Sequence, residues 1–104
     1  MATTTKAIAR TAAATSSTTL YTVPTTTTIT VVSNIVLSNA ATSASTATIV
    51  FDGITIVPAV SIPANSVVGF DMKQVIPANA TPKIITGFAS TTAVSIHISG
   101  VEIS

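Results

Sequence analysis

The sequence of 104 residues contains no cysteine and no tryptophan, and only 7% of its residues are charged. An ordinary soluble domain carries about 25% charged residues. Without cysteine, disulfide bonds and thiolate metal sites are excluded. The net charge of +1 also argues against nucleic acid as a partner, because such binding depends on many basic side chains.

The residue types that carry most catalytic and metal-binding chemistry are also scarce. The chain has one histidine and three acidic residues, and the acids lie in separate segments. A metal site or a Ser-His-Asp triad needs several such groups gathered in one place. The four glycines are isolated from one another, so they form no phosphate-binding loop. We therefore predict a protein that is not an enzyme and has no catalytic residue, metal, cofactor or small-molecule substrate.

Long apolar runs are missing too, although 47% of the residues are hydrophobic. Ser, Thr or Asn interrupts every run well before the ~18–20 residues that a membrane span needs. Residues 1–17 lack the apolar core of a secretory signal. We therefore expect no membrane partner, and synthesis in the cytoplasm.

Threonine and serine are the polar residues that the chain has in abundance. They keep the surface polar, but they provide almost no like-charge repulsion, and such surfaces tend to associate. We therefore expect the working state to be an assembly. A free monomer that hydroxyl groups alone keep soluble is the alternative.

Residues 1–17 consist mainly of Ala, Thr and Ser, with two basic residues and a lone Ile8. This composition buries too little apolar surface to fold alone. We expect an extended N-terminal arm, either as a disordered tail or as a segment that orders against a neighbouring subunit. Residues 18–104 would then form the folded domain.

From Thr18 onward, β-branched residues dominate and predict strands throughout. The first strand is expected at Thr18–Val23, ended by Pro24. Residues 25–38 follow with a period of two, which is typical of a strand with one face in a core. The expected core side chains are Ile29, Val31, Ile35 and Leu37, and Thr28 and Thr30 are expected on the opposite, exposed face.

Two turn signals divide the middle of the chain. Asp52-Gly53 lies between two apolar runs and predicts a two-residue hairpin, whose turn needs positive φ at both positions. The letters IPAN occur at Ile62–Asn65 and again at Ile76–Asn79. Proline lacks an N–H donor and Asn tolerates left-handed φ, so each copy is interpreted as a turn that reverses a strand. Together the two turns would bracket a strand pair.

The last strand, VSIHISGVEIS, shows a break in its alternation. Val94, Ile96 and Ile98 alternate with polar residues, whereas Val101 and Ile103 fall out of phase with them. A β-bulge at Ser99-Gly100 would return both sets to the core face. His97 would then lie on the opposite face as a surface or interface residue.

These patterns predict an all-β chain that forms an antiparallel β-sandwich. Short strands and turn signals at intervals of about 8–12 residues are typical of such folds. A jelly roll and an immunoglobulin-like sandwich both fit, each with the extended N-terminal arm.

Several segments also resemble a known group of proteins when they are taken in order. They are TLYTVP (Thr19–Pro24), ITVVSNIVLSNA (Ile29–Ala40), the hairpin, IPAN, and VSIHISGVEI (Val94–Ile103). Together they resemble small β-sandwich virion proteins of tailed bacteriophages, described as capsid decoration (cement), head-fibre or tail-associated structural proteins. The resemblance spans about residues 18–103. Relatives often have a glycine soon after YTVP, and Pro-Ala-Gly turns, where this chain has threonines and asparagines.

The resemblance implies a non-catalytic virion protein of symmetric, trimeric type that binds a capsid shell. We expect a decoration protein on the capsid surface, synthesised in the host cytoplasm. Its partners would be the major capsid protein and copies of itself as a homotrimer, without nucleic acid or membrane. The candidate contact residues are Lys6, Ile8 and Arg10 in the arm, and the threonines Thr28 and Thr30.

Three other functions stay open at this stage. The protein could belong to the tail or to a fibre base, which the sequence does not separate from a place on the head. A carbohydrate- or host-surface-binding module is a second alternative, but the chain offers only four aromatic residues for a sugar platform. Ice binding ranks last, because the Thr-x-Thr pattern at Thr28–Thr30 does not recur at a fixed period.

Overall fold

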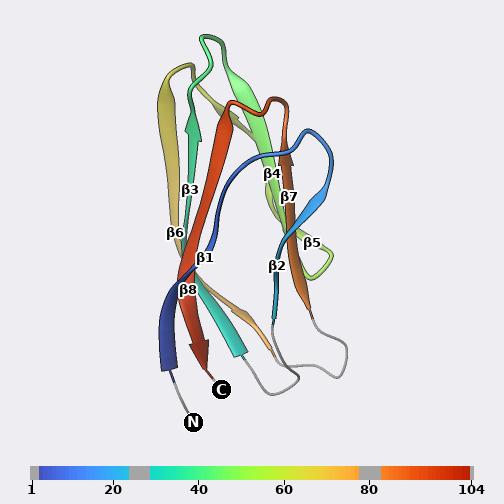
Figure 1. The fold of residues 1–104 in the computed structure, drawn as a ribbon, viewed down its shortest axis with the longest axis vertical. Coiled ribbons are helices and arrows are strands. Elements are labelled where there is room, and N and C mark those ends of the chain that lie inside the picture. The colour runs from blue at the N-terminus through green and yellow to red at the C-terminus, as the bar shows by residue number, and fades with distance from the viewer. Residues whose placement is uncertain (1–2, 24–28, 78–82, 104) are drawn as a thin grey trace.

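The computed structural model describes residues 3–23, 29–77 and 83–103, and within these ranges it contains strands and no helix. The prediction of an all-β antiparallel sandwich is confirmed (Figure 1). The eight strands are β1 (Thr3–Ala12), β2 (Thr18–Thr22), β3 (Ile29–Asn39), β4 (Ser45–Phe51), β5 (Ile54–Ile62), β6 (Ser66–Ile76), β7 (Ile84–Ala89) and β8 (Val94–Ile103).

The order of the strands decides between the two sandwich types. One sheet has the order β1-β8-β3-β6 and the other has the order β2-β7-β4-β5. β4 pairs with β5, β3 with β6, β2 with β7 and β1 with β8, as in one long hairpin. Additional pairing of β3 with β8 and of β4 with β7 wraps that hairpin into two sheets. This wrapping is the jelly roll, one of the double-sheet folds that viral capsid proteins use.

The N-terminal segment belongs to the sandwich, and the expectation of an arm over residues 1–17 is wrong for residues 3–12. These residues form β1, which pairs with β8 at the edge of the first sheet. Ile8, Ala9 and Ala13 are buried in the core. A low-complexity segment becomes a strand here because β8 supplies the hydrogen-bonding edge and the other sheet supplies the apolar contacts. The sequence of residues 1–17 alone reveals neither the edge of β8 nor the opposing sheet.

The core lies between the two sheets and is built from side chains that alternate along the strands. The two central strands of each sheet contribute most of it, because they have a neighbouring strand on either side. Burial of Val94, Ile96 and Ile98 confirms the expected inward face of the first half of β8. The largest fully buried apolar side chains are Ile35, Leu37, Ile49, Ile62, Ile85, Ile96 and Ile98.

The Asp52-Gly53 hairpin is confirmed. Phe51 at the end of β4 pairs with Ile54 at the start of β5. Asp52 and Gly53 between them have φ values of 51° and 78°, as the two central positions of this turn require.

The first IPAN copy is confirmed as a turn, but its geometry differs from the expected strand pair. β5 ends at Ile62, Asn65 adopts a φ of 52°, and β6 begins at Ser66. β5 and β6 belong to opposite sheets, so the turn carries the chain from one sheet to the other instead of closing a hairpin. The two copies therefore bracket one strand, β6. The second copy, at Ile76–Asn79, extends beyond the described residues.

The register of β3 contains an irregularity that the sequence did not reveal. Val32 pairs with Gly100, and Asn34 pairs with the preceding residue of β8, Ser99. Ser33 is therefore an extra residue opposite β8, which is the definition of a β-bulge. Its side chain is exposed, and its hydroxyl donates a hydrogen bond to the Ser99 carbonyl oxygen at 3.1 Å.

This bulge reverses the two faces of the first half of β3. Thr30 and Val32 are fully buried, whereas Ile29 and Val31 are only partly buried and face outward. The prediction placed Ile29 and Val31 in the core and Thr30 on an exposed face, and it is wrong for all three. The error arises because the period of two was continued through Ser33, where the extra residue shifts the phase.

β8 itself is regular, so the predicted bulge at Ser99-Gly100 is also wrong. The irregularities lie in its two neighbours, at Ser33 of β3 and at Ile8 of β1. The inward alternation of β8 continues through Gly100 to Glu102, and Val101 and Ile103 face outward. Four aliphatic residues expected in the core thus lie on the outer face of the first sheet.

Candidate interaction surface

The outward aliphatic residues of β3 and β8 lie side by side on the first sheet. Ile29 is in register with Ile103, and Val31 is in register with Val101. On the other side of β3, Val31 is also in register with Val75 of β6, whose side chain is 57% exposed. Side chains directly opposite each other in a sheet are about 4.5–5.5 Å apart at Cβ, so these residues form one continuous area. We name it the terminal apolar patch, and it consists of Ile29, Val31, Val75, Val101 and Ile103.

The patch lies at the end of the sandwich where both chain termini are found (Figure 1). The next row of the same outer face is Ala7, Ser99, Asn34 and Asp71, according to the register of the four strands. Small and polar side chains therefore border the apolar residues, and Asp71 is the only charged member of that row. A rimmed apolar area on an outer face is a common mark of a protein–protein contact.

The structure places the three candidate contact residues of the N-terminal segment in β1. Arg10 is exposed and lies opposite His97 of β8. Ile8 is buried in the core as the extra residue of its bulge, so its side chain is not on the surface of the chain. Lys6 is in register with Gly100, and its side chain lies outside what the structure describes.

The two candidate threonines have different outcomes. Thr28 lies outside the described residues. Thr30 is fully buried, and its hydroxyl oxygen lies 3.3 Å from the hydroxyl oxygen of Tyr21 on β2. A role for either residue in partner contacts stays a prediction, but Thr30 now has a structural role between the sheets.

Tyr21, Thr30 and Glu102 form a polar cluster between the sheets near the terminal end. The Tyr21 hydroxyl donates a hydrogen bond to a Glu102 carboxylate oxygen, which leaves the Thr30 hydroxyl to donate to Tyr21. Burial, followed by the hydrogen bond to Glu102, raises the pKa of Tyr21 from 10.0 to about 12. The neutral phenol is thus the stable form, and it joins β2 of one sheet to β8 of the other.

A second polar contact lies at the hairpin between β4 and β5. The Lys83 ammonium group lies 3.2 Å from a carboxylate oxygen of Asp52, and both side chains are partly exposed. The Asp52 amide also donates to the Ile84 carbonyl oxygen at 2.9 Å. Asp52 therefore forms the turn and ties it to Lys83 and Ile84. This structural role accounts for the acidic residue without a catalytic role.

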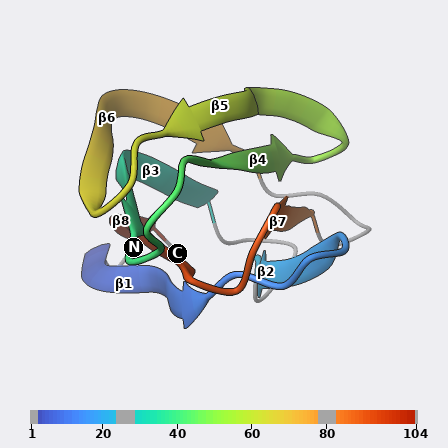
Figure 2. The ribbon, with the colours of Figure 1, turned by 90° about the horizontal axis from the view of Figure 1, so that it is seen from above.

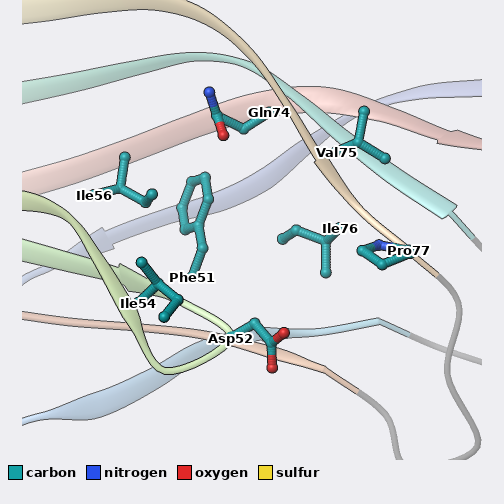
Figure 3. A pocket seen from close by; sticks show the side chains of 8 residues that line it. All are labelled: Phe51, Asp52, Ile54, Ile56, Gln74, Val75, Ile76 and Pro77. Carbon is teal, nitrogen blue, oxygen red and sulfur yellow. The ribbon is translucent and has the colours of Figure 1, made fainter.

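A cavity of about 240 Å³ opens between β5 and β6. Phe51, Ile54 and Ile56 lie on one side of it and Gln74 and Ile76 on the other (Figure 3). Small-molecule sites typically have volumes of about 300–1,000 Å³ and several convergent polar groups. This cavity is smaller and mainly apolar, so it does not point to a substrate.

The described residues do not gather the groups that a metal site requires, and three of the four aromatic rings pack in or against the core. Within residues 3–23, 29–77 and 83–103 there is no group of three or more His, Cys, Asp and Glu side chains that could hold a metal ion. Phe51 is buried, and Tyr21 and Phe70 pack against the core, so these rings offer no open platform for a sugar. The same ranges contain no helix that is long and apolar enough to cross a membrane.

Comparisons with known proteins bear on the fold. No family model matches the chain, and no curated protein matches it. Among solved structures, the chain is similar to a chain of the T13 IBDV viral particle, whose crystal structure is described as revealing a missing link in the evolution of icosahedral viruses. The TM-score is 0.56 at 15% sequence identity, and the match covers 98% of this chain and 31% of that chain.

This likeness concerns the fold alone, because the sequence identity is low. The chain spans about a third of the length of the viral chain that it resembles. The comparison shows that a similar fold occurs within a chain of a viral particle.

Proposed function

We propose that this protein is a non-enzymatic virion structural protein. In its most specific form, the proposal is a capsid decoration (cement) protein that binds the outside of a phage head and stabilises contacts between capsomers. The major capsid protein and further copies of the chain are the proposed partners.

The observation that carries this proposal is the terminal apolar patch. Its five aliphatic side chains lie on the outer face of a sheet, where Val75 is 57% exposed and the other four are partly exposed. Apolar surface removed from water contributes roughly 25 cal/mol per Å². Covering the patch with a partner would therefore be favourable.

Two further features support the proposal. The chain has seven charged residues among 104. Removing charged groups from water is a large cost of forming a polar interface, and this surface has few such groups to cover. A similar fold also occurs within a chain of the viral particle. Weak contacts of one small protein suffice in such a setting, because many copies on one shell act together through avidity.

The proposal is tested by adding the purified protein to particles that were assembled without it, followed by sedimentation. The expected result is saturable binding to heads and a higher temperature of head disruption. Val101→Asp, which puts a charge in the patch, should lower the binding at least about tenfold. The matched control is Ser95→Asp, on the same face of β8 at the opposite end, which should bind as the unmodified protein does.

Three results would contradict the proposal in different ways. Absence of binding to any particle would remove the virion role. Binding to isolated tails but not to heads would replace decoration with a tail or fibre role. Equal loss of binding in the Val101→Asp and Ser95→Asp variants would show that the patch is not the contact surface.

A further inference from the structure

The four edge strands of the sandwich all carry features that hinder pairing with a strand of another chain. β5 contains Pro58, and β2 has only five residues. β1 is interrupted by its bulge at Ile8. The register of β6 with β3 shifts at Met72 and Lys73, which both lie opposite Ser33. Prolines, bulges and short length protect sheet edges against association. We therefore expect a second copy to contact a face of the sandwich and not an edge.

The outer face of the first sheet carries the terminal apolar patch and two exposed charges of opposite sign at its margins. Arg10 lies on β1 and Asp71 lies on β6, and these strands form the two margins of the sheet (Figure 2). Among the described residues, neither side chain has an ion-pair partner in its own chain. The strands of the second sheet contain no charged residue. The charges that can orient a partner thus lie on the first sheet.

The register aligns the outward side chains of the first sheet in rows that run from β1 to β6. From the terminal end, the rows are Thr5, Val101, Val31 and Val75; Ala7, Ser99, Asn34 and Asp71; Arg10, His97, Val36 and Gly69; and Ala12, Ser95, Ser38 and Val67. In the last three of these rows, a small residue at one margin matches a larger residue at the other margin. The face is therefore complementary in size to itself when its left and right margins are exchanged.

A two-fold axis parallel to the strands, between β8 and β3, makes this exchange. It lays the face on the same face of a second copy, so each row covers its own counterpart in reverse order. Val101 of each copy then lies over Val31 of the other. Arg10 comes opposite Gly69, where the missing side chain leaves space for it, and Asp71 is two residues away on the same face. A Cβ at Gly69 would meet no atom of its own chain closer than 4.0 Å.

The twist of the sheets is compatible with this match of rows. Sheets packed face to face keep their strand directions within about 30° of each other. A margin strand lies about 7 Å from the axis, so such an angle displaces it by about 4 Å along the strand, which is less than the ~7 Å between rows. A face of four strands, each about ten residues long, covers about 600 Å². This area is below the ~800 Å² per partner of a standard stable interface, so a reversible contact is expected.

We propose that, in the free protein, the outer face of the first sheet is covered by the same face of a second copy, related by this two-fold axis. The two terminal apolar patches then cover each other, and two Arg10–Asp71 pairs join the margins. A two-fold contact closes with two copies, whereas the resemblance to phage proteins implied a trimer. The inference deepens the proposed function, and rests on it for the choice of surface, by naming a second copy as an occupant of the terminal apolar patch. On a particle, the shell takes the place of the second copy at the patch.

Light scattering on a sizing column tests the pairing. The mass should approach twice that of the chain as the concentration rises. Val101→Asp places a charge inside the contact and should weaken dimerisation at least about tenfold. Thr46→Asp is the matched control, because Thr46 is exposed on the outer face of the second sheet, and it should dimerise as the unmodified protein does. A monomer at all concentrations, a trimer, or equal losses in the two variants would overturn the inference.

Charge reversal tests the orientation of the two copies. Arg10→Asp and Asp71→Arg each bring like charges together across the contact, and each should weaken dimerisation at least about tenfold. In a mixture, one chain contributes only acidic groups at these two positions and the other only basic groups. A mixed dimer should therefore form although neither variant dimerises well alone, and a mixture that stays monomeric would overturn the orientation. Circular dichroism of each variant checks that the exposed substitutions leave the fold intact.

Cross-linking tests which face is covered, because the chain has no cysteine of its own. Ser99→Cys places a thiol close to the axis on each copy, and a short thiol-reactive cross-linker should yield a covalent dimer. Thr46→Cys places the thiols on the two outermost faces and should remain unlinked. Equal cross-linking of both variants would overturn the inference.

This inference and the proposed function fail separately. A protein that forms the dimer but binds no particle would remove the proposed function and leave the pairing of copies standing. A protein that binds particles but stays monomeric in solution would refute the pairing and leave the proposed function standing.

Discussion

Gly100 of β8 lies against the backbone of Val31 in β3, so closely that a Cβ atom at position 100 would overlap the Val31 carbonyl oxygen. This contact lies beside the bulge at Ser33, where β3 gains one residue relative to β8. Glycine is needed here for close approach of two backbones. Because the two backbones lie so close at Gly100, β8 stays regular while β3 accommodates the extra residue as a bulge.

Gly100→Ala is therefore expected to destabilise the fold. The added methyl group meets backbone atoms, which cannot move aside as a flexible side chain would, so we expect a loss of about 2 kcal/mol or more. Urea unfolding followed by circular dichroism measures it. Gly69→Ala is the matched control, since its Cβ would meet other atoms only at 4.0 Å, an ordinary contact distance, and its stability should stay unchanged or rise by up to ~1 kcal/mol. Similar losses for both glycines would contradict the close approach.

The reversed faces of β3 give a second prediction. Val32→Thr places a hydroxyl group in the core, where Val32 is fully buried, and should cost about 1–3 kcal/mol. Val31→Thr changes a residue on the outer face and should alter the free energy of unfolding by less than about 0.5 kcal/mol. Thermal or urea unfolding of the two variants compares adjacent positions of one strand. A larger loss of stability for Val31→Thr than for Val32→Thr would show that Val31 faces the core, as the sequence pattern predicted.

The Tyr21–Glu102 hydrogen bond predicts how stability depends on pH. Because the folded-state pKa of Tyr21 is raised from 10.0 to about 12, the folded protein holds the phenol proton more tightly than the unfolded chain does. This contribution is fully present below pH ~10 and is lost as the pH rises through ~12. Tyr21→Phe should lack this loss of stability.

The titration itself is directly measurable, because Tyr21 is the only tyrosine and the chain has no tryptophan. Tyrosinate absorbance should rise with a midpoint near 12 in the folded protein, and near 10 in urea. Glu102→Gln removes the carboxylate and should bring the folded midpoint closer to the ordinary value. A folded midpoint near 10 in the unmodified protein would contradict the burial and hydrogen bond of the phenol.

The hairpin between β4 and β5 separates a backbone effect from an ion-pair effect. Gly53 has a φ of 78°, so Gly53→Ala forces a side chain into the left-handed region and should cost about 1 kcal/mol. Asp52→Asn keeps a residue that tolerates positive φ and removes only the partly exposed ion pair with Lys83. It should cost less than about 0.5 kcal/mol. A larger loss for Asp52→Asn than for Gly53→Ala would show that the ion pair dominates.

The features that the sequence predicts correctly are those set by residues close to one another in the chain. Asp52-Gly53 demands its own turn, Asn65 tolerates the positive φ of the first IPAN turn, and alternation over a few residues suffices for the inward face of Val94, Ile96 and Ile98. The site is different, because no short segment shows that Ile29 and Ile103 share an outer face. That fact depends on the pairing of strands that are far apart in the chain.

The amino-acid sequence by itself determined the strand class, the positions of these turns and a surface rich in hydroxyl groups and poor in charge. These properties follow from side-chain chemistry and from φ preferences, which act over a few residues. Only the tertiary structure decided that residues 3–12 join a sheet and that the aliphatic residues around Ser33 and Gly100 face outward. The physical reason is that backbone hydrogen bonds must match across strands, and a single extra residue in one strand reverses every side chain beyond it.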